Sequence, residues 1–304
     1  MASSEVFQSI KESDEPIKPL PEQQSLDPKL VALGRKLFFD TALSKDNSVS
    51  CATCHDLNRG GTDRLTHSIG INKTEGPINA PTVLNSMYSF IQFWDGRATT
   101  LEEQAAGPIQ NPKEMGSTLD EVIVKLKNDP SYAQDFQSIF GSDPTPQAIT
   151  SAIATFERTL TTPNSPFDRF LRGDKTALAP EAEHGYKLFK MYGCISCHQG
   201  RNVGGNMFQK LGIMGDYFVD RGNITQADLG RYNVTHLESD RHVFKVPSLR
   251  NVELTAPYFH DGSAKTLQEA VRVMAKYQLG RSLSDEDTSL IIAFLKSLTG
   301  EQPK

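Results

Sequence analysis

Apolar residues recur along the chain mainly at helical spacing. Between Thr145-Pro146 and Pro163 they are separated by 4, 3 and 4 residues, which predicts one helix that Pro163 ends. A second helix is predicted from about Ser284. The apolar faces are formed by Ile149, Ile153, Phe156 and Leu160 in the first helix and by Leu290, Phe294 and Leu298 in the second. Because convincing alternating strands are absent, the pattern predicts a mainly α fold.

Start signals predict further helices. Asp27 is a predicted N-cap with Pro28 at the first helical position, and this helix runs to about Phe39. Three more helices begin with a Thr followed by Glu three residues later, which spells a capping box. These starts are Thr100 to Glu103, Thr118 to Glu121 and Thr266 to Glu269.

Length and charge limit the function classes. The 304 residues suggest about two domains. The longest apolar run, Leu290 to Leu295, is far shorter than the roughly 20 residues of a membrane span. The net charge is -5 and Lys and Arg form no block, which argues against nucleic-acid binding. Residues 1–24 are polar, acidic and rich in Pro, so we expect an extended arm.

All four cysteines belong to two matching motifs. Cys51 and Cys54 precede His55, and Cys194 and Cys197 precede His198. Cys-x-x-Cys-His is the attachment signal of c-type haem, in which both thiols form thioethers and the histidine ligates the iron. A zinc site needs no histidine at the fifth position, a thioredoxin-like pair needs a strand–helix context, and a disulfide across two residues closes little entropy. We therefore predict two c-type haems.

The chain contains an internal duplication. Residues 81–96 (Pro-Thr-Val-Leu-Asn to Trp-Asp-Gly) recur as residues 247–262, and a Gly-x-Lys-Leu-Phe segment precedes each haem motif. The haem motifs are offset by 143 residues and the downstream segments by 166, so the second half carries 23 extra residues, which we place in Gly200 to Arg231. We predict two cytochrome c-like haem domains, residues 25–164 and 165–304, that meet near Pro163 to Pro166.

The second axial ligand of each iron determines whether the haem transfers electrons or binds a small molecule for catalysis. Met274 lies on the helix that Thr266 opens and ranks first among the methionines as a ligand; Met191, Met207 and Met214 are its rivals. The first half has Pro108 at the matching position. The two haems are therefore ligated differently, which suggests that one carries electrons and the other does chemistry.

From about Asp27 to Leu298 the chain resembles the bacterial dihaem cytochrome c peroxidases. The two haem motifs carry this resemblance together with residues 93–97, 104–115, 244–251, 258–262 and Met274. The resemblance implies reduction of hydrogen peroxide to water. It also implies a small electron-donor protein, either a cytochrome c or a cupredoxin, and a homodimer.

Roles for individual residues follow from the same resemblance. The haem on His198 and Met274 would receive electrons, and the haem on His55 would be peroxidatic. Trp94 would relay electrons between them, and Gln104 and Glu114 would line the peroxide pocket. A calcium ion between the domains would be held by the Asn79 side chain and the backbone carbonyls of Thr255 and Pro257; oxygen ligands suit this hard cation.

One loop departs from the family pattern. Well-known members have Ser-Ile-Gly-His, whose histidine is a displaceable ligand of the peroxidatic iron, whereas this chain has Ser68 to Ile71 with isoleucine last. Either His67 takes that role, or the iron is five-coordinate when fully oxidised. The second outcome predicts that the all-ferric protein reacts with peroxide.

Two other functions remain open. The first is a dihaem electron-transfer protein without catalysis. The second is a dihaem enzyme that oxidises a partner protein to make a tryptophan-derived cofactor, although that family uses tyrosine where Met274 stands. Because c-type haem is attached outside the cytoplasm, we expect a periplasmic protein whose signal peptide is absent from this sequence.

Overall fold

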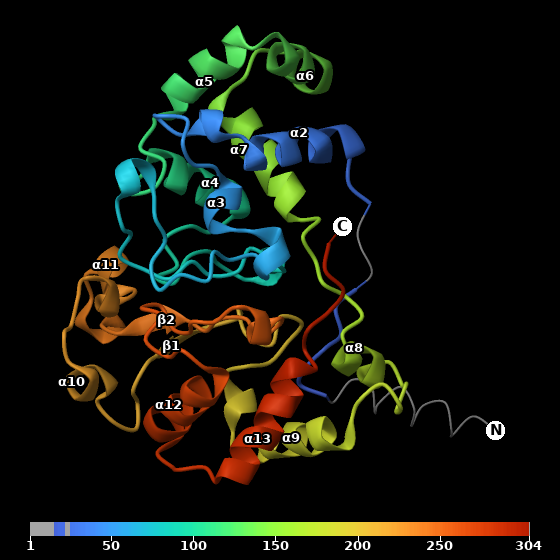
Figure 1. Cartoon of the computed structure of the whole chain (residues 1–304), viewed down its shortest axis with the longest axis vertical. Helices are drawn as coiled ribbons and strands as arrows, with labels where there is room; N and C mark the ends of the chain where they lie inside the picture. Colours follow the sequence, from blue (N-terminus) through green and yellow to red (C-terminus); the bar gives the residue numbers. More distant parts are fainter. Residues whose placement is uncertain (1–14, 22–24, 304) are drawn as a thin grey trace.

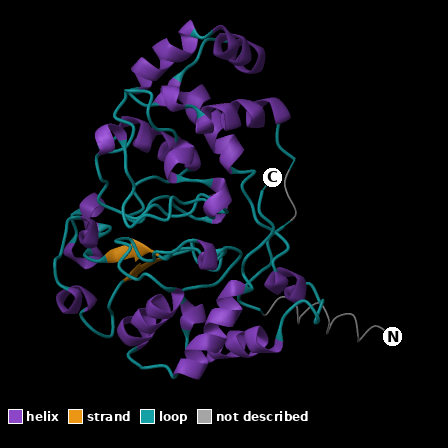
Figure 2. Cartoon of the chain, viewed as in Figure 1, coloured by secondary structure: helices purple, strands orange, loops and turns teal. Residues whose placement is uncertain are grey.

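The computed structural model describes residues 15–21 and 25–303. Two mainly helical halves lie one above the other, and their irregular loops face each other across the middle of the molecule (Figure 1). Helices dominate both halves, and the only strands among the described residues form one small sheet in the lower half (Figure 2). The predicted fold class, mainly α with two cytochrome c-like halves, is confirmed.

Among the described residues, the N-terminal half contains six α-helices. They are α2 (Pro28–Phe39), α3 (Cys51–Cys54), α4 (Leu101–Gln110), α5 (Leu119–Asn128), α6 (Pro130–Phe140) and α7 (Pro146–Glu157). Short 3₁₀ turns join them at Thr41–Leu43, Leu57–Arg59, Ile71–Lys73 and Ser86–Tyr88.

The C-terminal half adds a two-stranded sheet to its helices. Its helices are α8 (Pro166–Leu171), α9 (Pro180–Met191), α10 (Tyr217–Arg221), α11 (Tyr232–Thr235), α12 (Leu267–Leu279) and α13 (Asp285–Lys296). Antiparallel strands β1 (Phe208–Lys210) and β2 (Val243–Lys245) place Phe208 opposite Lys245. At three residues each, they are too short for an alternating pattern to have indicated them.

The predicted helix starts are confirmed with one difference. Asp27 accepts a hydrogen bond from the Lys29 backbone at the start of α2, and Thr118 and Thr266 form complete capping boxes. At α4 the Glu103 carboxylate instead accepts from the Thr99 backbone. The prediction that Pro163 ends the helix from Thr145 is wrong: α7 ends at Glu157, six residues earlier.

The same helix crossing recurs in both halves. A Cβ at Gly34 of α2 would lie 1.9 Å from the Ala152 carbonyl oxygen of α7. A Cβ at Gly185 of α9 would lie 1.9 Å from the Leu290 carbonyl oxygen of α13. Since only glycine allows such an approach, each half fixes its first long helix against its last one. Separate hydrophobic cores surround the two crossings.

The halves exchange matched backbone hydrogen bonds. The Asn79 N–H donates to the His260 carbonyl at 2.7 Å, and the Lys245 N–H donates to the Trp94 carbonyl at 2.8 Å. Asn79 and Lys245 differ by the duplication offset of 166 residues, and so do Trp94 and His260. The contact between the halves is therefore pseudo-symmetric.

Residues 15–21, which belong to the predicted arm, pack on the C-terminal half. The side chains of Ile17 and Leu20 are fully buried there. The rest of the predicted arm, residues 1–14 and 22–24, lies outside the described residues. No helix among the residues that the structure describes is both long and apolar enough to cross a membrane.

Candidate haem sites and peroxide pocket

The first haem motif forms a single helical turn. Ser50 caps α3, and its backbone N–H donates to the Thr53 hydroxyl at 2.9 Å. The His55 N–H donates to the Cys51 carbonyl, which turns the imidazole back beside the two cysteines. His55 Nδ1 lies 3.2 Å from the Gly61 carbonyl oxygen. This pairing assigns the ring proton to Nδ1 and leaves Nε2 as the basic nitrogen.

The second motif repeats this arrangement on a 3₁₀ turn, Cys194–Ser196. The His198 N–H donates to the Cys194 carbonyl at 3.0 Å, and His198 Nδ1 lies 3.4 Å from the Val203 carbonyl oxygen. Burial lowers the pKa of His198 to about 4, and it also lowers the pKa of His55. Both rings are therefore neutral at pH 7, as an iron ligand must be.

The cysteines have the properties expected of thioether-forming residues. All four are free, half-buried thiols. Burial raises the pKa of Cys51 to about 12 and the pKa of Cys54 and Cys194 to about 11. A reactive redox pair has a lowered thiol pKa, so this chemistry argues against that alternative. The carbonyls of Gly61 and Pro81 act on the His55 ring, and those of Val203 and Pro247 act on the His198 ring.

Open space lies beside the first motif. A pocket of about 460 Å³ is bordered by Thr53, between the two thiols, and by the loop that holds Ile69 and Gly70. The two thiols and the neutral His55 imidazole fit a covalently attached haem on the N-terminal half.

Glu114 lies close to this first site. Its carboxylate contributes to the raised pKa of both Cys51 and Cys54, after burial and after the larger effects of Glu157 on Cys51 and Asp63 on Cys54. Burial raises the pKa of Glu114 itself, while Arg97 and a 2.6 Å hydrogen bond from Asn111 Nδ2 oppose that shift. Asn111 engages one carboxylate oxygen of Glu114, and no described residue hydrogen-bonds to the other, which can therefore exchange a proton.

Gln104 is half-buried on α4, the helix that ends just before Asn111. Its side-chain amide makes no hydrogen bond to any residue that the structure describes. The amide is therefore available to a bound small molecule.

The loop that departs from the family pattern borders the first site and is held by its own bonds. Ile71 is buried in the N-terminal core, and its N–H donates to the Glu114 carbonyl at 2.8 Å. Further backbone bonds join Gly70 to Thr74 and Gly76 to Ser68. His67 Nδ1 is paired with the Glu75 carboxylate at 2.9 Å. The loop is thus closed on itself and on Glu114.

Trp94 lies where the two halves meet. Its indole Nε1 donates to the Asn79 carbonyl at 3.0 Å, and its ring lies 6.3 Å from the ring of His260. The indole also packs against the third apolar cluster, which the C-terminal half supplies. Met274 packs against the same cluster, so the predicted relay and the predicted sulfur ligand share one environment.

The rival methionines differ in exposure. Met191 and Met214 are 66% and 60% exposed, whereas Met207 and Met274 are half-buried. Sulfur ligation of a buried iron favours the half-buried pair, and of these Met274 lies on the helix that sequence spacing singled out.

The residues predicted for calcium come from two segments in contact. Asn79 is buried, its Nδ2 donates to the Leu65 carbonyl at 2.7 Å, and its backbone is bonded to His260. Thr255 and Pro257 lie just before His260 on the same segment. The Asn79 Oδ1 has no donor among the described residues, which fits an oxygen ligand of a hard cation.

The insertion contains polar residues that sequence reasoning missed. Asp228 is buried, its carboxylate lies 2.7 Å from His260 Nε2, and Arg221 pairs with both Asp228 and Asp261. The ring of His242 stacks on the ring of Phe218, with 4.1 Å between the ring centroids. These residues span 40 positions of the sequence, from Arg221 to Asp261, so no local motif indicates them.

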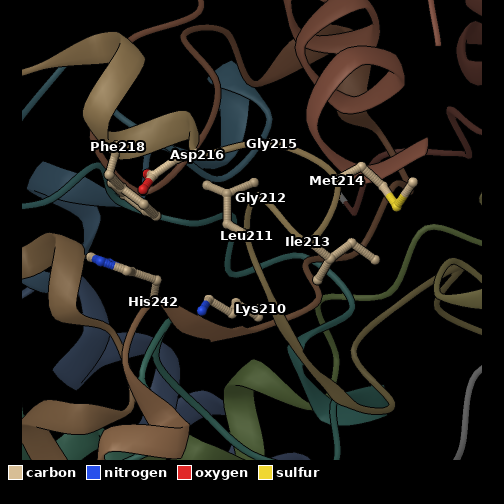
Figure 3. A pocket seen from close by; sticks show the side chains of 9 residues that line it. All are labelled: Lys210, Leu211, Gly212, Ile213, Met214, Gly215, Asp216, Phe218 and His242. Atoms are coloured by element: carbon tan, nitrogen blue, oxygen red, sulfur yellow. The ribbon is translucent and has the colours of Figure 1, made fainter. Parts of the chain in front are cut away.

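The insertion also borders a pocket of about 360 Å³ (Figure 3). Its lining runs from Lys210 to Asp216 and includes Phe218 and His242. None of the residues predicted to act on peroxide lines it.

Comparisons with known proteins agree with this geometry. A family model described as di-haem cytochrome c peroxidase matches residues 28–176, and a cytochrome c model matches residues 182–299. The cytochrome c551 peroxidase of Nitrosomonas europaea is 50% identical over 295 residues, which cover 97% of this chain and 87% of the relative. The cytochrome c peroxidase Ccp of Escherichia coli K12 is 50% identical over 288 residues, which cover 94% of this chain and 62% of the relative.

A solved structure has the same fold. The crystal structure of a MauG-like protein associated with microbial copper homeostasis superimposes with a TM-score of 0.81 at 28% identity and covers 94% of this chain and 93% of that one. The chain belongs to the di-haem cytochrome c peroxidase family. Two c-type haems are the cofactors of this family, and both Cys-x-x-Cys-His sites fit them.

Proposed function

We propose that this protein reduces hydrogen peroxide with electrons from a small redox protein. The balanced reaction consumes one peroxide, two electrons and two protons and yields two waters. Electrons enter the C-terminal half and pass through Trp94 to the N-terminal half. The observation that carries this proposal is the contrast between two matching haem motifs, one beside Glu114 and the other in the half that holds Met274.

Haem, when bound, supplies the iron and the electrons for cleavage of the O–O bond. The chain supplies proton transfer and orientation. The free oxygen of Glu114 takes a proton from one peroxide oxygen and returns it to the other, which is general acid–base catalysis. The Gln104 amide, which has no internal partner, orients the peroxide by hydrogen bonding.

We further propose that the N-terminal site is open to peroxide before any reduction. Ile71 is buried in the core and cannot be a ligand, and its loop is tied to Glu114. His67 is paired with Glu75. These contacts support the second of the two outcomes expected from the sequence, in which no histidine has to be displaced.

Stopped-flow mixing of the all-ferric protein with peroxide tests this proposal. A rapid change of the N-terminal haem spectrum is expected without added reductant. Reaction only after one haem is reduced would reject the open site and would point to His67; a His67→Ala variant would then react directly. Two haems that stay six-coordinate and low-spin at every redox level would identify a non-catalytic electron-transfer protein.

We also propose a bound calcium ion and a periplasmic location, each supported by one observation. The free Oδ1 of Asn79, with the nearby carbonyls of Thr255 and Pro257, supports a calcium ion between the halves. Spectra of the half-reduced protein with and without a chelator test it. Covalent haem attachment supports a periplasmic location, which fractionation of the producing cell tests.

A further inference from the structure

Two buried tyrosines, Tyr217 and Tyr277, belong to the third apolar cluster. Trp94 and Met274 pack against the same cluster. Tyr277 also follows Met274 by three residues on α12, so the two side chains lie on one face of that helix. Two oxidisable phenols therefore share the environment of the predicted relay and the predicted sulfur ligand.

Ring contacts connect Tyr277 to Trp94. The ring centroids of Tyr277 and Tyr217 are 5.2 Å apart, and those of Tyr217 and Phe218 are 5.3 Å apart. The centroids of Phe218 and His260 are 6.1 Å apart, and those of His260 and Trp94 are 6.3 Å apart. Every separation lies within about 4.5–7 Å, the usual range for packed aromatic pairs. An electron can therefore pass from Tyr277 to Trp94 through a short series of packed rings.

The outer end of this series reaches solvent through hydrogen bonds. The Tyr277 hydroxyl donates to the Asp220 carboxylate at 2.8 Å and accepts from Lys276 Nζ at 2.8 Å. The side chains of Asp220 and Lys276 are 53% and 64% exposed, whereas Tyr277 is only 8% exposed. A phenol that loses an electron becomes strongly acidic, and a carboxylate within hydrogen-bond reach can take its proton. Tyr277 is thus a buried phenol whose proton acceptor is open to water.

The tyrosine pair has no equivalent in the N-terminal half. Tyr217 lies on α10, within the segment 200–231 in which we placed the extra residues of the second half. Asn111 stands at the position that matches Tyr277, 166 residues earlier. The pair is therefore a feature of the half in which electrons are proposed to enter.

We propose that Tyr277 supplies an electron to the peroxide-oxidised protein when no donor protein is bound. This inference rests on the proposed function, because peroxide is the oxidant. Peroxide removes two electrons from the protein; Tyr277 provides one by way of Tyr217 and Trp94, and the other comes from a haem. The phenolic O–H bond breaks, its proton passes to Asp220, and a neutral tyrosyl radical remains. The oxidising equivalent thereby moves from the haems to the protein surface, where a small reductant such as ascorbate restores the phenol.

Freeze-quench EPR of the holoprotein, mixed with one equivalent of hydrogen peroxide in the absence of a donor protein, tests the proposal. We expect a tyrosyl signal that narrows when the protein is labelled with ring-deuterated tyrosine. Tyr277→Phe keeps the ring contacts and removes the phenol, so most of this signal should be lost. Tyr132→Phe is the matched control, because Tyr132 is also buried and also donates to a carboxylate, that of Asp40, at 2.6 Å. Tyr132 lies in the N-terminal core, away from the cluster of Trp94, so its variant should keep the wild-type signal.

Haem bleaching gives a second readout. During exposure to excess hydrogen peroxide, the haem absorbance of Tyr277→Phe should be lost faster than that of the wild type or of Tyr132→Phe. If Tyr277→Phe does not fold, Asp220→Asn replaces it: this variant removes the proton acceptor at an exposed position and should weaken the tyrosyl signal.

Three results would overturn the proposal. They are the absence of a tyrosyl signal in the wild type, an unchanged signal in Tyr277→Phe or its substitute Asp220→Asn, and an equal loss in Tyr132→Phe. The haem spectrum separates this inference from the proposed function. A haem spectrum that changes with peroxide while no tyrosyl signal forms rejects this inference alone, whereas a spectrum that peroxide leaves unchanged rejects the proposed function and this inference with it.

Discussion

The two halves share a scaffold and differ at the positions that face the chemistry. Both cross their first and last long helices at a glycine, Gly34 or Gly185, and both set Cys-x-x-Cys-His beside that crossing. The helix downstream is different: α4 has 10 residues and contains Pro108, whereas α12 has 13 and carries Met274 at the matching position. A single duplicated framework therefore carries a thioether in one half and a proline at the matching position of the other.

The residues at the contact between the halves differ in the same way. Trp94 and His260 occupy equivalent positions, and each carbonyl accepts a hydrogen bond from the opposite half. The indole is satisfied by the Asn79 carbonyl, but the imidazole needs Asp228 from the insertion. The extra residues of the second half thus support a polar residue that the first half does not need.

The largest effect is expected from removing the proposed proton-transferring group of the N-terminal half. Glu114→Gln keeps the shape of the side chain and removes its ability to accept a proton. We expect peroxide turnover to fall by about 10²- to 10⁴-fold, the range for loss of a general acid–base group. Steady-state assays with matched haem content measure it. A loss below tenfold would remove Glu114 from the mechanism.

Next comes the predicted sulfur ligand of the C-terminal half. Met274→His replaces a thioether by imidazole and should lower the potential of that haem, because axial ligands set potentials over a range of roughly 0.8 V. Redox titration measures the change. Met214→His, at a 60% exposed position, is the control and should titrate as wild type. An unchanged midpoint in Met274→His would exclude Met274 as a ligand.

A smaller effect tests whether the two helix crossings are equivalent. Gly34→Ala and Gly185→Ala each place a Cβ 1.9 Å from a carbonyl oxygen. We expect each to lower the free energy of unfolding by about 1–3 kcal/mol. Denaturant unfolding of the holoprotein measures it, with Gly215→Ala as control because its Cβ would come no closer than 3.3 Å to the Tyr277 ring. A neutral effect at one crossing would show that this half can relax.

The smallest effect concerns pH. Burial raises the pKa of Glu114, and the hydrogen bond from Asn111 Nδ2 opposes that rise by stabilising the ionised form. Because the base must be ionised, activity is lost as the pH falls through this pKa. Asn111→Ala removes the bond, so we expect the acid limb of kcat/KM to move to higher pH. Asn111→Asp, which keeps the acceptor for the Lys113 N–H and adds a like charge, should move it at least as far. Movement to lower pH would contradict this account.

Local signals predicted the helices and both haem motifs well. Asp27 with Pro28, Thr118 and Thr266 mark helix starts that the structure confirms, because a cap depends on a few neighbouring residues. The end of α7 was predicted at the wrong residue. The helix ends at Glu157 without a proline, so no local breaker marks its end. The two strands were missed because three residues carry no period.

Long-range partners were beyond the sequence. Lys245 follows Val243 and Phe244 in an ordinary apolar run, and nothing local indicates that this lysine is only 9% exposed. The Asp228–His260 pair joins residues 32 positions apart. Likewise, the sequence shows that Ile71 stands where related proteins have histidine. Only the structure shows the hydrogen bond from the Ile71 N–H to the Glu114 carbonyl. Tertiary packing determines each of these contacts, whereas sequence patterns report only on residues that are close together along the chain.

The segment 15–21 implies an order of assembly. Ile17 and Leu20 are buried on the C-terminal half, where the Lys18 carbonyl accepts from Arg250 and the Leu20 carbonyl from Arg172. Because these partners belong to the C-terminal half, segment 15–21 has no binding surface until that half has folded. The segment made first is therefore among the last to dock.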